Sequence, residues 1–247
     1  MGLKMLNEVF SDHFAQRKNY LTEVDARAKM LLAAAAIIIV VSSRHPYVPL
    51  IVFFSSLIFL LGIKIPLRII LFRLAAPLSI AGAIFVMQIF FYGMAEGLAR
   101  GLLIMAKVSG AVSVIIFLSM TTPVNKLLNA ARWFKVPNTW VEIAMLSYRY
   151  SFVLLEDAAT IRNAQKVRLG YSSLSRSLKS FGELMGSVVI KTYDRSIAVY
   201  ESMMLRGYNG TMQNVAWEDR PGIKDAAAVM IFTVILALLL MLNMLLQ

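Results

Sequence analysis

The chain has 247 residues, of which 59% are hydrophobic and none is cysteine, and its formal net charge at pH 7 is +11. Soluble domains are about 45–50% apolar, so this composition indicates a protein solvated by a lipid bilayer. The lack of cysteine excludes disulfides and thiolate metal sites. The positive charge suits the cytoplasmic loops of a membrane protein better than a nucleic-acid interface, because no basic stretch is interleaved with aromatic residues.

Apolar stretches along the chain predict an all-α membrane protein with about five transmembrane helices. They cover residues 30–43, 47–62, 74–91, 102–120 and 226–246. The third is expected to carry Pro77 in its first turn, where proline is tolerated. Between the third and the fourth, the sequence YGMAEGLARG at 92–101 is expected to form a polar turn.

The distribution of Lys and Arg predicts the orientation of the chain in the bilayer. Residues 1–29, 63–73 and 123–224 are rich in both, whereas the loops on the opposite side hold only Arg44 and Arg100. By the positive-inside rule the basic segments are cytoplasmic, so we expect the N-terminus inside and the C-terminus outside. Residues 1–29 lack the apolar core of a signal peptide and are expected to be a cytoplasmic segment.

The region 123–223 is too charged to span a membrane and too apolar for a linker, so it predicts amphipathic helices at the cytoplasmic face. The first is expected to have Thr122 as its cap and Pro123 at its first helical position. The next two are expected at about 140–168 and 180–206. The predicted organisation is therefore 1–29 cytoplasmic segment, 30–122 four transmembrane helices, 123–223 amphipathic helices and 224–247 last transmembrane helix.

The sequence contains none of the motifs that would indicate catalysis. A P-loop, an HExxH motif and a GxSxG motif are all absent, so no catalytic residue, metal site or directly bound cofactor is expected. His13 and His45 fall on opposite sides of the membrane in the predicted topology and cannot form one metal site. Lys107 is the one ionisable residue well inside an expected span, and we expect it to extend toward the outer interface.

Two of the predicted amphipathic helices end alike, in an arginine followed closely by glycine. One interpretation is a simple helix end, because a C-terminal cation gains roughly 0.3–1 kcal/mol from the helix dipole and glycine closes the helix. The repetition, with a small residue one turn before each arginine, favours bidentate recognition of a carboxylate on a partner. The residues concerned are Ala164, Arg168 and Gly170 in the first copy, and Ser202, Arg206 and Gly207 in the second.

These segments resemble the T component of energy-coupling factor (ECF) transporters, in its CbiQ-type cobalt and nickel branch. The resemblance covers nearly the whole chain and rests on VDARAKMLL (24–32), LSYRY (146–150), AQKVRLGY (164–171) and DRSIAVYESMMLRGYNG (194–210). The Ala-Arg-Gly-like signatures of that family fall on 164–170 and 204–207. Here the two copies depart from the tripeptide, as Val-Arg-Leu and Leu-Arg-Gly, although both arginines are present.

The resemblance implies a non-catalytic subunit of the prokaryotic inner membrane that works in a complex. Two ABC ATPases would bind ATP on the cytoplasmic side, and Arg168 and Arg206 would each enter the groove of one ATPase. A separate membrane subunit would capture Co²⁺ or Ni²⁺ and pack against this chain. Supporting roles are expected for Asp25, Arg27, Lys29 and Arg195, although the first three fit simple juxtamembrane charges equally well.

Two other functions stay open at this stage. A stand-alone secondary carrier would use Lys107 and the Met-rich helices to handle its solute, and it would transport without ATPase partners. A membrane-bound lipid-modifying enzyme would draw its acid or base from Glu142, Glu156 or Asp157, which have no histidine partner.

Overall fold

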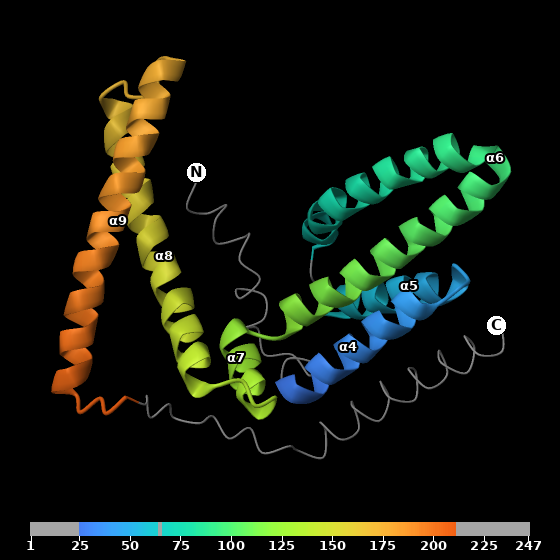
Figure 1. Ribbon diagram of the computed structural model, residues 1–247, viewed down its shortest axis with the longest axis horizontal. Helices are drawn as coiled ribbons and strands as arrows, with labels where there is room; N and C mark the ends of the chain where they lie inside the picture. Colours follow the sequence, from blue (N-terminus) through green and yellow to red (C-terminus); the bar gives the residue numbers. More distant parts are fainter. Residues whose placement is uncertain (1–24, 64–65, 211–247) are drawn as a thin grey trace. The chain divides into compact units, whose positions relative to one another are not determined.

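The computed structural model describes residues 25–63 and 66–210, and this part of the chain consists of helices joined by short connections, without any strand (Figure 1). The predicted all-α class is therefore confirmed for the described residues. The predicted N-terminal segment and the last predicted span, 226–246, lie outside them. The helices are α4 (Ala26–Ser42), α5 (Tyr47–Gly62), α6 (Leu67–Thr121), α7 (Val124–Trp133), α8 (Asn138–Val167) and α9 (Leu174–Leu205).

The described chain forms two compact units, residues 25–130 without 64–65 and residues 131–210. The first unit contains α4, α5 and α6. Helix α4 begins four residues before the predicted start at 30, because the Asp25 carboxylate accepts a hydrogen bond from the Arg27 backbone N–H at 2.9 Å and caps the helix. The predicted bounds of the second span, 47–62, agree with α5.

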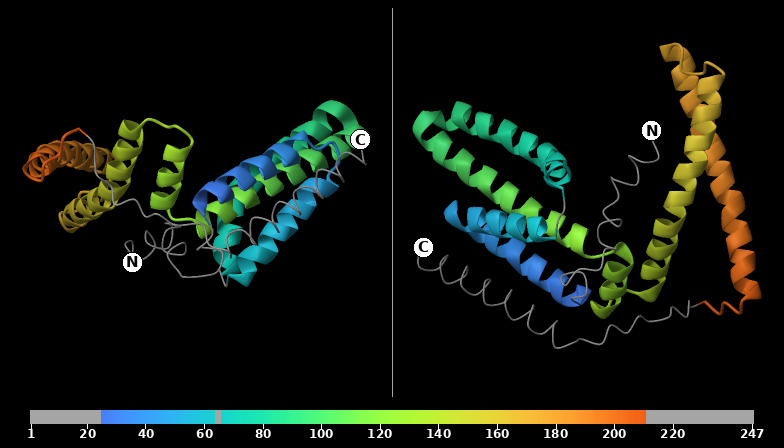
Figure 2. Two further views of the ribbon diagram at one scale, coloured as in Figure 1. Left: turned by 90° about the horizontal axis from the view of Figure 1, so that it is seen from below. Right: turned by 180° about the vertical axis from the view of Figure 1, so that it is seen from behind.

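The predicted spans at 74–91 and 102–120 correspond to the two arms of helix α6. The structure has 55 helical residues that double back at Gly93, where φ is +78° and ψ is 174° (Figures 1 and 2). The first arm begins at Leu67, so Pro77 lies inside the helix and not in its first turn. Both arms exceed the roughly 20 residues that a membrane-spanning helix needs.

The predicted polar turn at 92–101 is wrong except at Gly93. Residues 94–101 are helical, and their glycines bring helices together. A Cβ on Gly97 would lie 2.6 Å from Ile89 Cα, and one on Gly101 would lie 2.5 Å from the Phe85 ring. Gly97 therefore lets the backbones of the two arms approach closely, as small residues do between membrane helices, and Gly101 leaves room for the Phe85 ring.

Two lysines join α4 to the second arm of α6, and each caps the C-terminus of the other helix. Lys29, in the first turn of α4, donates its Nζ to the Thr121 carbonyl oxygen at 3.3 Å. Lys107, on α6, donates to the Val41 carbonyl oxygen at 2.7 Å. The last carbonyls of a helix have no partner within it and carry partial negative charge, so a cation there is stabilising.

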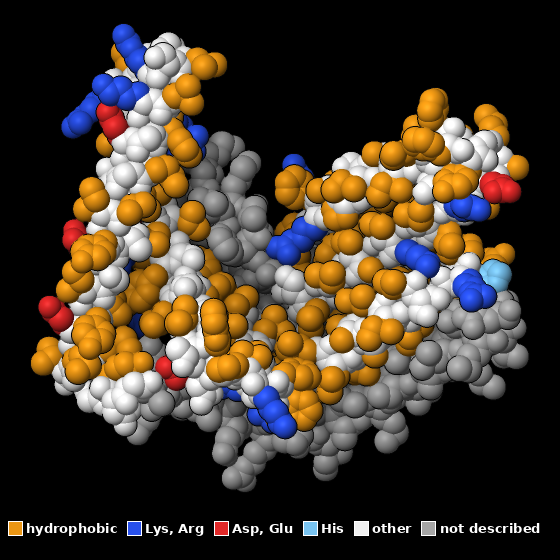
Figure 3. Space-filling model, viewed as in Figure 1, with side chains coloured by type: hydrophobic (Ala, Val, Ile, Leu, Met, Phe, Trp, Pro, Cys, Tyr) orange, Lys and Arg blue, Asp and Glu red, His pale blue; other side chains and the backbone are white. Residues whose placement is uncertain are grey.

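The surface of the first unit is strongly apolar (Figure 3). Two clusters of buried side chains fill its interior, one around Leu60 and Met120 and the other around Val40 and Val48. Large apolar side chains also point outward, including Phe90 at 84% exposed. Among the described residues, α6 is the one helix long and apolar enough to cross a membrane, and α5 is a shorter apolar helix. These features are those of a membrane protein.

The second unit contains the end of α7, all of α8 and all of α9. Helix α7 corrects the predicted cap, because the Pro123 carbonyl accepts the first helical N–H groups, from Lys126 and Leu127, and Pro123 therefore lies one position before the helix. Thr122 is instead the C-cap of α6, and its buried hydroxyl has no hydrogen-bond partner among the described residues.

The lysine caps generate a stability prediction. Replacing Lys29 by Met keeps the length of the side chain and removes the ammonium group, so the Thr121 carbonyl loses that donor. We expect the free energy of unfolding to fall by about 1–3 kcal/mol. Denaturant titration of the purified chain in detergent measures it. Lys179→Met, at an exposed position of α9, is the matched control. Equal stability of the two variants would contradict the capping role.

Candidate functional site

Helices α8 and α9 form an antiparallel pair that is closest near its connecting turn and diverges toward the other end (Figures 1 and 2). Asp157 joins them midway, since its carboxylate lies 3.7 Å from Lys191 Nζ and 3.5 Å from Arg195 Nη2. Helix α9 begins at Leu174, six residues before the predicted start at 180, because Ser173 Oγ accepts the Arg176 N–H at 3.4 Å.

Helix α8 ends in a Schellman motif with Arg168 as its C-cap residue. The Gly170 N–H bonds to the Gln165 carbonyl at 2.8 Å, and the Leu169 N–H bonds to the Lys166 carbonyl at 3.0 Å. Leu169 takes the left-handed conformation, with φ +59°. The expectation that a glycine closes this helix is therefore wrong, because the left-handed position precedes Gly170.

Gly170 has another purpose, which is close packing against α9. A Cβ on this residue would lie 2.6 Å from Ser180 Oγ, and the Ser180 hydroxyl donates to the Gly170 carbonyl at 2.9 Å. The Gln165 side-chain amide donates to the Ser180 carbonyl at 2.8 Å and accepts from the Tyr171 hydroxyl at 2.9 Å. Sequence reasoning missed this network, although Gln165 and Tyr171 both lie within the quoted stretch AQKVRLGY.

Helix α9 ends in the same motif, with Arg206 as its C-cap residue. The Tyr208 N–H bonds to the Met203 carbonyl at 3.1 Å, and the Gly207 N–H bonds to the Met204 carbonyl at 3.0 Å. Here Gly207 takes the left-handed conformation, with φ +81°, as the sequence predicted. The two arginines therefore occupy the same structural position at the ends of two different helices.

Both arginine side chains are exposed, and neither has a hydrogen bond or an ion pair within the described ranges. The backbone N–H groups of each Schellman motif already bond to the helix-end carbonyls, so these guanidinium groups do not act as caps. The small residues one turn earlier, Ala164 and Ser202, are also exposed. Each end thus presents an accessible, bidentate donor to a partner.

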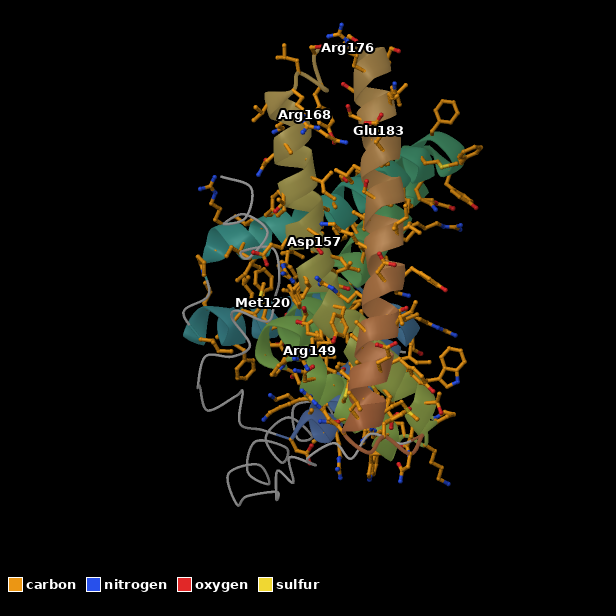
Figure 4. The ribbon with its side chains drawn as sticks, turned by 90° about the vertical axis from the view of Figure 1, so that its left-hand side faces the viewer. Met120, Arg149, Asp157, Arg168, Arg176 and Glu183 are labelled. Carbon is orange, nitrogen blue, oxygen red and sulfur yellow. The ribbon has the colours of Figure 1, made fainter. Side chains whose placement is uncertain are left out.

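The two arginines lie at opposite ends of the helix pair, because α9 runs away from the turn that follows Arg168 (Figures 1 and 4). Its 32 residues make it about 48 Å long at about 1.5 Å per residue. One small binding site therefore cannot receive both guanidinium groups, and two separate sites are needed.

The two ends differ in charge. We call residues 162–180 the Arg168 end and residues 194–210 the Arg206 end. The Arg168 end holds five cations, Arg162, Lys166, Arg168, Arg176 and Lys179, and one acidic residue, Glu183, lies beside it one turn after Lys179 (Figures 3 and 4). The Arg206 end also carries Asp194 and Glu201. An acidic partner is therefore attracted over a longer range by the Arg168 end.

The structure gives the supporting candidates partners of their own. Arg195 is paired with Asp157 on α8 and lies about three turns before Arg206. Asp25, Arg27 and Lys29 belong to the first unit, where Asp25 caps α4 through the Arg27 N–H and Lys29 caps α6.

Two of the three acidic residues considered for catalysis have structural partners, whereas Glu156 is exposed on α8. Glu142 is buried and lies 3.6 Å from Arg132 Nη2, and Asp157 pairs with Lys191 and Arg195. Lys107, considered for solute handling, is bonded to the end of α4. Within the described ranges, no three His, Cys, Asp or Glu side chains gather as they would to hold a metal ion.

Comparison with known families decides the class of the protein. Residues 17–216 match the family model CbiQ, described as cobalt transport protein. The chain belongs to this family. The cobalt transport protein CbiQ of Rhodobacter capsulatus is 30% identical over 72% of the chain and 75% of its own length. An uncharacterised protein of Methanocaldococcus jannaschii is 32% identical over 90% of the chain and 89% of its own length.

A further relative, a putative fused cobalt transport protein CbiMQ of Methanocorpusculum labreanum, is 30% identical over 92% of the chain. The match covers 41% of that fused protein. The protein is therefore a component of an ion transporter and belongs to a cobalt transport family, not to a family of enzymes. Membership of CbiQ agrees with the apolar surface of the first unit.

The end of α9 generates a second prediction. Gly207→Ala places a Cβ on a residue with φ +81°, which costs about 1–2 kcal/mol and loosens the motif that positions Arg206. We expect faster amide hydrogen exchange at residues 203–208, measured by mass spectrometry. Gly182→Ala, inside α9 where a Cβ meets open space, should slow exchange, because alanine favours helix. Unchanged exchange in Gly207→Ala would refute the requirement for glycine.

Proposed function

We propose that the chain is the transmembrane coupling subunit of an ECF-type ABC importer. It would link ATP hydrolysis by two ATPase subunits to movement of a membrane subunit that captures the substrate. The observation that carries the proposal is the pair of exposed arginines, Arg168 and Arg206, at equivalent positions of two helix ends that close with the same hydrogen bonds. A lone carrier has no evident use for such a pair on a basic surface.

The partners that best fit these ends are two copies of an ABC ATPase with acidic grooves. A guanidinium group recognises a carboxylate in a bidentate manner, and removing water from the pair strengthens it. The length of α9, about 48 Å at about 1.5 Å per residue, requires two docking sites, which a dimer supplies. ATP would bind to the ATPases, so this chain itself would need no cofactor.

The membrane placement is part of the same proposal. The two arms of α6, together with α4, α5 and the last apolar stretch at 226–246, would make five spans with the N-terminus in the cytoplasm of a prokaryotic cell. The apolar surface of the first unit and the concentration of Lys and Arg in 123–224 support this orientation.

The substrate would be Co²⁺, with Ni²⁺ as the second choice, and it would bind to the capture subunit. Family membership supports the metal class. The fused relative supports a partner subunit, because its name joins a second part, M, to the part that resembles this chain. Closure of the ATPases on ATP would bring the ends of α8 and α9 closer together. We expect this movement to reorient the capture subunit, which then releases the ion inside.

Charge removal at each arginine tests the proposal. Arg168→Gln or Arg206→Gln in the full-length chain should weaken ATPase binding about thirtyfold or more, because losing one partner of a desolvated ion pair costs about 2–5 kcal/mol. Affinity is measured by titrating the purified ATPase into the complex in nanodiscs, and transport by uptake of radioactive cobalt. The affinity for the ATPase and the uptake of cobalt should both fall in each variant.

Arg44→Gln is the matched control, since Arg44 is an exposed arginine between α4 and α5 in the first unit and belongs to neither helix end. Wild-type binding and uptake in both single variants would contradict the docking role. Uptake by the chain alone, reconstituted without any ATPase, would establish a secondary carrier in place of a coupling subunit.

A further inference from the structure

The residue before each arginine is an aliphatic side chain in solvent. Leu205 is 90% exposed and Val167 is 85% exposed, and they are the two most exposed large hydrophobic side chains among the described residues. Each is the last residue of its helix, directly before the C-cap arginine. The same unfavourable exposure thus occurs at equivalent positions of both ends.

The terminal motif does not by itself demand this exposure. Helix α7 closes with the same pair of hydrogen bonds, from Val136 N–H to the Ala131 carbonyl and from Lys135 N–H to the Arg132 carbonyl. Its last residue, Trp133, is only 52% exposed, and its C-cap position is not an arginine. Near-complete exposure of an aliphatic residue therefore accompanies the arginine and not the motif.

We propose that Val167 and Leu205 are apolar anchors that insert beside the arginines into the grooves of the ATPase subunits. The inference rests on the proposed coupling function and specifies the chemistry of each groove, which combines an apolar pocket with a carboxylate. An anchor that fills such a pocket excludes water from the neighbouring ion pair, and the lower local dielectric strengthens that pair.

The charges near each anchor predict how strongly ATPase binding at each end depends on the anchor and on electrostatic attraction. Val167 is the smaller anchor and lies among the five cations of the Arg168 end. Leu205 is larger and lies one turn after Glu201, which weakens attraction to an acidic surface. We therefore expect the Arg206 end to depend more on its anchor, and the Arg168 end to depend more on salt concentration.

A protein groove fits these ends better than a membrane surface. Both ends carry the same residue order, aliphatic then arginine, at the same position of the same motif, which is typical of recognition by two equal sites. An anionic bilayer recognises net positive charge, and acidic side chains at the Arg206 end oppose it. Binding to lipid is therefore the alternative outcome of the test.

Alanine variants of the full-length chain provide the test. Alanine removes the anchor and favours helix, so fraying does not explain a loss of binding. The ATPase that co-purifies with the tagged chain is identified, purified separately and titrated against each variant in nanodiscs. If the anchors are fully buried in the complex, affinity should fall about tenfold for Val167→Ala and about fiftyfold for Leu205→Ala. Leu205→Met should keep near wild-type affinity.

Ile190→Ala is the control, because Ile190 is an exposed aliphatic residue of α9 away from both ends. Wild-type affinity in both anchor variants, with weakened binding in Arg168→Gln and Arg206→Gln, would overturn the inference and leave the coupling function standing. Absence of ATPase binding by the wild-type chain would overturn both. Binding to vesicles of phosphatidylcholine and phosphatidylglycerol that Leu205→Ala abolishes, while ATPase affinity stays unchanged, would assign the anchors to the membrane.

Discussion

The carbonyl groups at the C-terminus of a helix need partners, and the way this chain supplies them determines which of its cations are accessible. In the first unit, lysine side chains donate hydrogen bonds to these carbonyls. Lys29 does so at the end of α6 and Lys107 at the end of α4. In the second unit, backbone N–H groups in Schellman motifs donate to the helix-end carbonyls. Arg168 and Arg206 are consequently not needed as caps, and their guanidinium groups are available to a partner.

Stiff helices then hold these end groups in the positions that coupling to two ATPases requires. A helix of 32 residues places the two arginines at separate sites without requiring a large core. The Asp157 ion pairs hold α8 against α9 midway, and the Gln165–Ser180 contact holds them near the turn. Toward the Arg206 end the two helices diverge (Figure 1). We infer that this divergence leaves the end of α9 freer to move when the ATPases close.

Local sequence signals predicted the helices well, and long-range contacts were beyond them. The bounds of α5 and the left-handed Gly207 followed from hydropathy and turn chemistry. The sequence predicted Gly97 and Gly101 to be turn residues, because it does not distinguish a glycine that takes a positive φ from one that allows close packing. The Lys29 and Lys107 caps join residues 92 and 66 positions apart, and nothing local marks them.

The central claim is that one chain binds two ATPase subunits, one at each of its two helix ends. The most direct test places a photoreactive amino acid at positions 169 and 204 of the full-length chain, singly and together, in the assembled complex. We predict that each single variant cross-links to an ATPase and that the double variant yields one chain joined to two ATPase subunits. Cross-linking from only one position, or from both positions to a single ATPase subunit, would contradict the claim.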